Sequence, residues 1–191
     1  MRKVLVAASA ALLVSVASTG AMANDFEAEL SALAAGKIRE ISQSAELVAA
    51  IKAQNEKNAS LGQADIDKLD KQWRAEVDAG SKPMIDGVMG NELSKFLAQK
   101  KEASGGLITE AFVMDDKGLN VGQSDVTSDY WQGDEDKFRK SFGAGHGALF
   151  IDPPERDEST QILQCQASMT VVDETGRPIG AITVGVNLDQ L

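Results

Sequence analysis

Strand-like runs alternate with Asp/Gly turns from residue 109 to residue 191, and this alternation constrains the fold more than any other feature. Tetrapeptides of the form Asp-x-x-Gly, at 115–118 and 173–176, separate runs that follow one another directly, as in β-hairpins. The sequence therefore predicts a five-stranded antiparallel sheet. Its strands are expected at residues 107–114, 119–124, 148–151, 161–172 and 178–188.

The two longest predicted strands each have an apolar face and a more polar face. The apolar residues are Leu163, Cys165, Ala167, Met169 and Val171 in one strand and Ile182, Val184, Val186 and Leu188 in the other. The other face carries Gln164, Gln166, Ser168, Thr170, Ala181, Thr183, Gly185 and Asn187. Such a face suits either solvent or a pocket, and we favour solvent because antiparallel sheets usually have one solvated side.

Helical periodicity precedes the sheet. Residues 26–55 predict one long amphipathic helix, in which Gly36 favours a local break or fraying. Two further helices are expected at residues 64–79 and 84–102, separated by a turn that ends in Pro83. Trp73 lies on the apolar stripe of the second helix and is interpreted as a core residue. A short helix is expected within residues 134–142, after which 143–147 form a loop.

The N-terminus has the pattern of a secretory signal peptide. Arg2 and Lys3 precede an apolar run at residues 4–16, and Ala21-Met22-Ala23 is a small-x-small cleavage site. We expect cleavage after Ala23, export to a bacterial periplasm, and no membrane span in the mature chain, since no later run approaches the required length of about 20 residues. The alternative is that the segment stays uncleaved as an anchor.

Composition limits the partners. Removing the first 23 of 191 residues leaves 168, which suits one domain, with a helical region at 24–106 and a sheet region at 107–191. Of the 19 basic residues 17 remain, against 29 acidic ones, so the net charge is −12. This charge argues against nucleic acid or an anionic membrane surface as a partner. With Cys165 as the only cysteine, no internal disulfide can form.

An acidic and aromatic block at residues 124–135 is the candidate ligand site. Asp125, Asp129, Tyr130 and Trp131 bring carboxylates beside aromatic rings, which favours a neutral or cationic ligand. The alternative is an ordinary acidic loop with a buried ring pair. The carboxylates of Asp125, Asp129, Asp134, Glu135 and Asp136 leave calcium open, although their spacing does not match an EF-hand.

The sequence contains no motif that points to catalysis or to a bound cofactor. The chain has one histidine, His146, in a glycine-rich loop, and Cys165 lies on an apolar strand face, so neither a multi-histidine metal site nor a Cys-His pair is expected. There is no C-x-x-C-H run for haem attachment and no phosphate-binding loop. We therefore expect a binding protein rather than an enzyme, without a metal or cofactor.

Three motifs in order resemble the Cache (PDC, PAS-like) extracytoplasmic sensor domains. They are Phe112-Val113-Met114-Asp115-x-x-Gly118, the block at 124–135, and the run from Asp173-x-x-Gly176-x-Pro178 to Val186. The resemblance covers residues ~107 to 191 strongly and the N-terminal helix loosely. It implies an α+β fold, a single Cache domain in which a long helix packs behind a five-stranded antiparallel PAS-like sheet whose other side binds small organic ligands. By this resemblance Gln164, Gln166 and Asn187 join the site.

The resemblance implies ligand sensing, as in chemoreceptors and histidine kinases. Amino-acid-binding members resemble one another in an Arg-x-Trp-Tyr stretch and a carboxylate in the last strand. Here Glu135-Asp136-Lys137-Phe138 and Asn187 occupy those places, so amino acids are not the first choice. We expect a free-standing periplasmic sensor that binds a small polar ligand and signals through a partner such as a membrane receptor or kinase. The alternative is an interaction module, such as a homodimer, that associates through its N-terminal helix.

Overall fold

The computed structural model describes residues 26–157 and 161–191. The predicted signal peptide and its cleavage site after Ala23 lie outside the described residues. Within the described residues, no helix combines the length and apolar character needed to cross a membrane.

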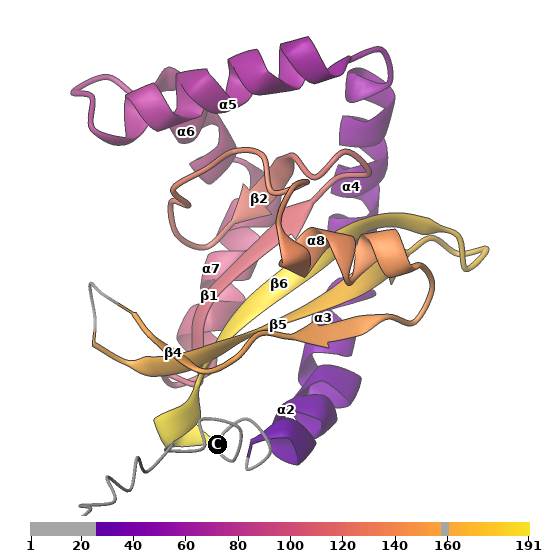
Figure 1. Ribbon diagram of the computed structural model, residues 1–191, viewed down its shortest axis with the longest axis vertical. Coiled ribbons are helices and arrows are strands. Elements are labelled where there is room, and N and C mark those ends of the chain that lie inside the picture. Colours follow the sequence, from indigo (N-terminus) through magenta and orange to yellow (C-terminus); the bar gives the residue numbers. More distant parts are fainter. Residues whose placement is uncertain (1–25, 158–160) are drawn as a thin grey trace, which may run out of the picture.

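A single antiparallel sheet forms the centre of the molecule (Figure 1). Its strands are β1 (Ile108–Met114), β2 (Asn120–Gln123), β3 (Leu149–Ile151), β4 (Glu155–Arg156), β5 (Leu163–Val172) and β6 (Pro178–Asn187). The order is β2-β1-β6-β5-β3, and β4 also pairs with β5. The expected α+β class and antiparallel sheet are thus confirmed. The strand count differs, because the two residues of β4 pair with the first residues of β5 and add a sixth strand.

The N-terminal helical segment is not one continuous helix, contrary to expectation. It consists of α2 (Glu27–Leu33), a π-helical turn η1 (Ala34–Ile38), α3 (Arg39–Ser42) and α4 (Ala45–Asn58). Gly36 lies within the π turn and does not break the chain. The break falls at Ser44, which adopts the extended conformation of a helix N-cap. Two residues earlier, at the end of α3, Ser42 Oγ donates a hydrogen bond to the Arg39 carbonyl oxygen at 2.8 Å.

The next helices also differ in one respect from the sequence prediction. Helix α5 (Gln63–Val77) matches expectation, whereas the predicted helix at 84–102 is divided into α6 (Pro83–Met89) and α7 (Glu92–Ala103). Asn91 causes the division, because its side chain accepts a hydrogen bond from Ser94 N at 2.8 Å and so caps α7. Later in the chain, α8 (Asp136–Arg139) and the 3-10 turns η2 (Phe142–Ala144) and η3 (Leu188–Gln190) are short.

The main core lies between one face of the sheet and the helices α2, α4 and α7. It contains the apolar face predicted for β5 and β6, together with Ala111 and Val113 of β1. A second cluster under α5 includes Trp73, which is fully buried and stacks on Tyr130 at a centroid distance of 5.4 Å. The interpretation of Trp73 as a core residue is confirmed.

The opposite face of the sheet is not solvent-exposed, contrary to the interpretation that we favoured. Ser168 and Thr183 are fully buried and hydrogen-bond to each other at 2.9 Å. Helix α8 and η2 lie over this face (Figure 1), where Phe138 packs with Phe112 and Met114. Antiparallel sheets usually have one solvated face, but this sheet does not, because the long connection between β2 and β3 folds back across the strands.

Asp115 joins the sheet to the helices. This fully buried carboxylate starts the turn after β1 and accepts hydrogen bonds from Lys117 N and Leu119 N, both at 2.9 Å. It also accepts one from Asn58 Nδ2 at 2.8 Å and one from Gln54 Nε2 at 3.1 Å, both on α4. Four donors therefore replace the water that the buried carboxylate has lost.

Asp115→Ala should lower the free energy of unfolding by roughly 2–4 kcal/mol, because Lys117 N, Leu119 N and Asn58 Nδ2 lose their acceptor and Gln54 Nε2 loses one of its three. Chemical denaturation of the variant and the parent measures the difference. Asp116→Ala is the matched control: its side chain is exposed, and a change within about 0.5 kcal/mol is expected. Equal effects of the two substitutions would contradict the role given to Asp115.

Candidate functional site

An open groove lies at the end of the polar sheet face that α8 leaves uncovered. Its volume is about 380 Å³. The lining comes from β1, the start of β5, the end of α7 and the loop after β2. The lining residues are Lys101, Gly106, Ile108, Thr109, Glu110, Asp125, Val126, Asp157, Ile162 and Gln164.

Glu110 is the central charged group of this groove. It projects from β1 on the polar side of the sheet, and Gln166 Nε2 donates to its Oε1 at 2.8 Å. Burial raises the pKa of Glu110, and this effect exceeds the lowering by the hydrogen bond from Gln166 and by the charge of Lys137. A partly desolvated carboxylate with one amide donor retains capacity to accept hydrogen bonds from a ligand.

A register shift in β1 shapes the groove next to Glu110. The shift falls between Ile108 and Glu110, opposite β6, and brings Thr109 over Gly185. A Cβ atom at Gly185 would lie 2.4 Å from Thr109 Oγ1 and 2.8 Å from Glu110 Cγ, so only glycine permits this approach.

Three buried polar atoms on or near this face lack a partner among the described residues. They are Thr109 Oγ1, in the groove lining, and Gln123 Nε2 and Asn120 Oδ1, on fully buried side chains that pair across from Phe112 and Met114. Buried polar atoms without partners are uncommon in native proteins and call for an explanation such as a bound ligand. The face therefore offers both an acceptor and a donor that the protein does not use internally.

The structure brings three of the seven predicted site residues to the groove and leaves the other four outside its lining. Asp125 and Gln164 line the groove, and Gln166 reaches it through Glu110. Asn187 lies opposite Gln164 in the sheet, but its Oδ1 accepts from Asp189 N at 3.0 Å and caps η3. The remaining three, Asp129, Tyr130 and Trp131, lie outside this lining.

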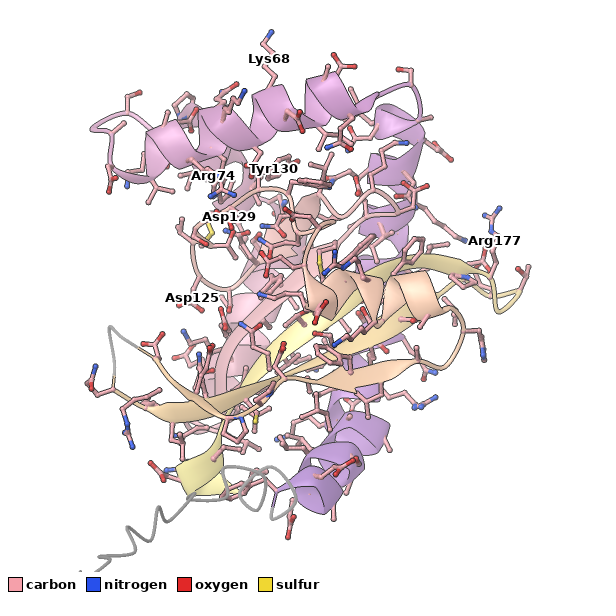
Figure 2. The ribbon with its side chains drawn as sticks, viewed as in Figure 1. Lys68, Arg74, Asp125, Asp129, Tyr130 and Arg177 are labelled. Carbon is pink, nitrogen blue, oxygen red and sulfur yellow. The ribbon has the colours of Figure 1, made fainter. Side chains whose placement is uncertain are left out.

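Helix α5 holds these three residues in place. Asp70 Oδ1 accepts hydrogen bonds from Tyr130 N at 3.0 Å and Trp131 N at 3.1 Å. Arg74 bridges Asp70 and Asp129, with nitrogen to oxygen distances of 2.7 Å to both. Figure 2 shows Arg74, Asp129 and Tyr130 together beneath α5, and Asp125 farther along the same loop.

The carboxylates considered for calcium are separated by their own partners. Asp125 pairs with Lys101 at 2.5 Å, Asp129 with Arg74, and Asp136 with Arg139 and Lys140. In residues 26–157 and 161–191, no three His, Cys, Asp or Glu side chains come together as a metal site.

Sequence reasoning missed Thr109 and Glu110, which lie within the first predicted strand. The available signal was a charged residue in the middle of an otherwise apolar run, since a carboxylate in a central strand needs a specific partner. Lys137 was also missed as a neighbour of this site. Its ammonium group lies 5.5 Å from the centroid of the Phe112 ring and pairs with Glu135 at 2.9 Å.

No family model matches the sequence, and no curated protein matches it. Solved structures do match. The sensor domain of the V. cholerae histidine kinase DctB is 14% identical, with a TM-score of 0.48 over 89% of this chain and 57% of that one. The ligand-binding domain of the Pseudomonas aeruginosa PAO1 chemoreceptor PctC, in complex with GABA, is 12% identical, with a TM-score of 0.41 over 61% and 54%.

The ligand-binding domain of the Campylobacter jejuni chemoreceptor Tlp3, with 4-methylisoleucine, is 10% identical, with a TM-score of 0.39 over 91% of this chain and 62% of that one. The chain thus spans 54–62% of the length of these three structures. All three are sensor or ligand-binding domains, the class of domain that the sequence resembles. Their TM-scores lie below 0.5.

Stability should depend on pH through Glu110. Its pKa is higher in the folded chain than in the unfolded chain, so the folded state binds this proton more tightly and loses stability as the pH rises above the ordinary carboxyl range. Glu110→Gln removes this dependence. The variant should therefore gain stability relative to the parent between pH 4 and pH 7, measured by urea unfolding. An equal difference at both pH values would contradict the assignment.

Asp70→Ala should loosen the loop that carries Tyr130 and lower the free energy of unfolding by about 1–3 kcal/mol, because two backbone donors lose their acceptor. Amide exchange should accelerate at residues 127–131. Asp67→Ala, one turn away on the exposed side of α5, is the control and should leave exchange in the loop unchanged.

Proposed function

We propose that this chain is an exported sensor protein that binds a small polar molecule in the groove at Glu110. The observation that carries the proposal is the buried polar sheet face, on which Thr109 Oγ1 has no partner among the described residues and lies beside a carboxylate with a raised pKa. Such convergence of polar groups in a partly apolar hollow is typical of ligand sites. The predicted leader supports placement in a periplasm.

The charges around the groove favour a cationic or neutral ligand. Glu110, Asp125 and Asp157 are acidic, and Lys101, the one basic residue among the described lining residues, pairs with Asp125. The described residues of the lining include no arginine, so they offer no planar fork for a ligand carboxylate. A ligand with an ammonium or amide donor would satisfy Glu110 and Thr109 together.

The proposed output passes through a second protein, such as a membrane receptor or kinase. We assign no catalytic group to the described residues, so the proposed signal is a change of conformation on ligand binding. Ligand-induced ordering of the loop at residues 124–127, which borders the groove, would provide the change that a partner detects.

A thermal-shift screen of primary amines, amides and neutral polar metabolites should find compounds that raise the melting temperature in a saturable way. For an amine, Glu110→Gln should weaken binding roughly tenfold or more, because a hydrogen bond to a charged group contributes about 1.5–3 kcal/mol.

Glu56→Gln serves as the matched control, since Glu56 is exposed on α4 and outside the groove lining. It should leave the affinity unchanged. The proposal fails if no compound binds, or if the two glutamate variants bind equally well.

A further inference from the structure

A second cavity lies between α4, α5, α6 and β2, apart from the groove at Glu110. Its volume is about 590 Å³, within the range of small-molecule sites. In Figure 1, α5 crosses above this region, with α4 on one side and α6 on the other. The apolar walls are formed by Leu61, Leu69, Met84, Val88, Val121 and the ring of Tyr130.

Three side-chain amides, those of Gln54, Asn58 and Gln72, contribute polar groups to the cavity lining. Asn58 Nδ2 donates to Asp115 at 2.8 Å, and Gln72 Nε2 donates to Glu76 at 2.9 Å. Gln54 Nε2 donates to Asp115 and to two backbone carbonyl oxygens. Because only the NH₂ end of an amide can donate to a carboxylate, the orientation of each side chain is fixed.

The carbonyl ends of these amides remain as acceptors. No described residue donates a hydrogen bond to Gln54 Oε1, Asn58 Oδ1 or Gln72 Oε1. Asn58 as a whole is 6% exposed, but its oxygen is not among the fully buried atoms without a partner, so solvent or a ligand in the cavity can reach it. The lining thus offers hydrogen-bond acceptors to a ligand that carries donors.

Two buried carboxylates behind the cavity lining favour a cationic ligand. Asp115 and Glu76, which accept from the three amides, are buried carboxylates and polarise the amide oxygens toward stronger acceptors. Lys57, the single charged residue among the described lining residues, is exposed on α4. Its charge is therefore screened by solvent more strongly than the two buried carboxylates.

Gly87 keeps part of the cavity open. It lies inside α6 and lines the cavity together with Met84 and Val88 of the same helix, and a Cβ atom there would meet no heavy atom within 4 Å. Glycine inside a helix costs stability relative to alanine, and neither close packing nor a positive φ requires it here. Space for a ligand provides a reason for this glycine.

The geometry points to a second binding site in this cavity, for a small primary amine with an apolar body. The body packs against Leu69, Met84 and Val88, and the ammonium group donates to the amide oxygens of Gln54, Asn58 and Gln72. This site is independent of the proposed function of the groove at Glu110.

The test uses 2-phenylethylamine as the probe. Its binding is followed by calorimetry and by tryptophan fluorescence, to which Trp73 contributes as the ring stacked on Tyr130 of the cavity wall. Gly87→Leu places an isobutyl group in the cavity and should weaken binding by roughly tenfold or more. The reason is that the isobutyl group takes space that the apolar body of the amine needs, and a difference of even one methylene group in a hydrophobic pocket changes affinity by about 10-fold or more. Gly87→Ala should weaken binding less and raise the melting temperature. Gly36→Leu, in a helical segment outside the cavity with open space around it, should bind like the parent.

Chemical specificity provides the second arm. The isosteres 2-phenylethanol and 3-phenylpropionate share the apolar body, and they should bind more weakly in the order alcohol, then carboxylate. Absence of saturable amine binding would overturn the proposal, as would equal binding to Gly87→Leu, provided that this variant melts cooperatively. Tighter binding of 3-phenylpropionate would overturn the assigned ligand class.

The glutamate and glycine variants also tell the two sites apart, because Glu110→Gln alters only the groove. If amine binding is lost in Glu110→Gln and kept in Gly87→Leu, the probe binds in the groove, and the second site is overturned.

Discussion

The buried carboxylate of Asp115 is the interaction on which the arrangement of helices and sheet depends. Two of its four hydrogen bonds close the turn after β1, and the other two come from α4. The same amides of Gln54 and Asn58 line the second cavity. One desolvated charge therefore fixes the hairpin, positions the long helical segment against it, and sets which end of each amide remains accessible.

The loop after β2 depends on a second set of contacts, from α5. Asp70 and Arg74 hold the backbone and side chains of residues 129–131, and Trp73 Nε1 donates to the Thr127 carbonyl oxygen at 2.8 Å. The same loop begins at Asp125 on the rim of the groove. A helix far from the groove thus restrains one of its walls, so motion of α5 and order at the groove are physically linked.

Much of the sheet could be predicted, because a period of two and Asp-x-x-Gly turns are local signals. The helix breaks at Ser44 and Asn91 were missed, since capping competes with apolar periodicity that continues across both positions. Asp125 and Gln164 were placed at a site, and both line the groove. Tyr130 and Trp131 could not be placed, because their surroundings come from α5, about sixty residues earlier in the sequence. Glu110 became visible only when the fold brought Gln166 and the register shift beside it.

Hydrogen–deuterium exchange with and without a compound that raises the melting temperature tests the central claim most directly. If the groove at Glu110 is the sensing site, protection should concentrate in β1 near Glu110, in the loop at residues 124–127 and in the first residues of β5. Protection absent from these three segments and present only in the N-terminal helices would contradict the account.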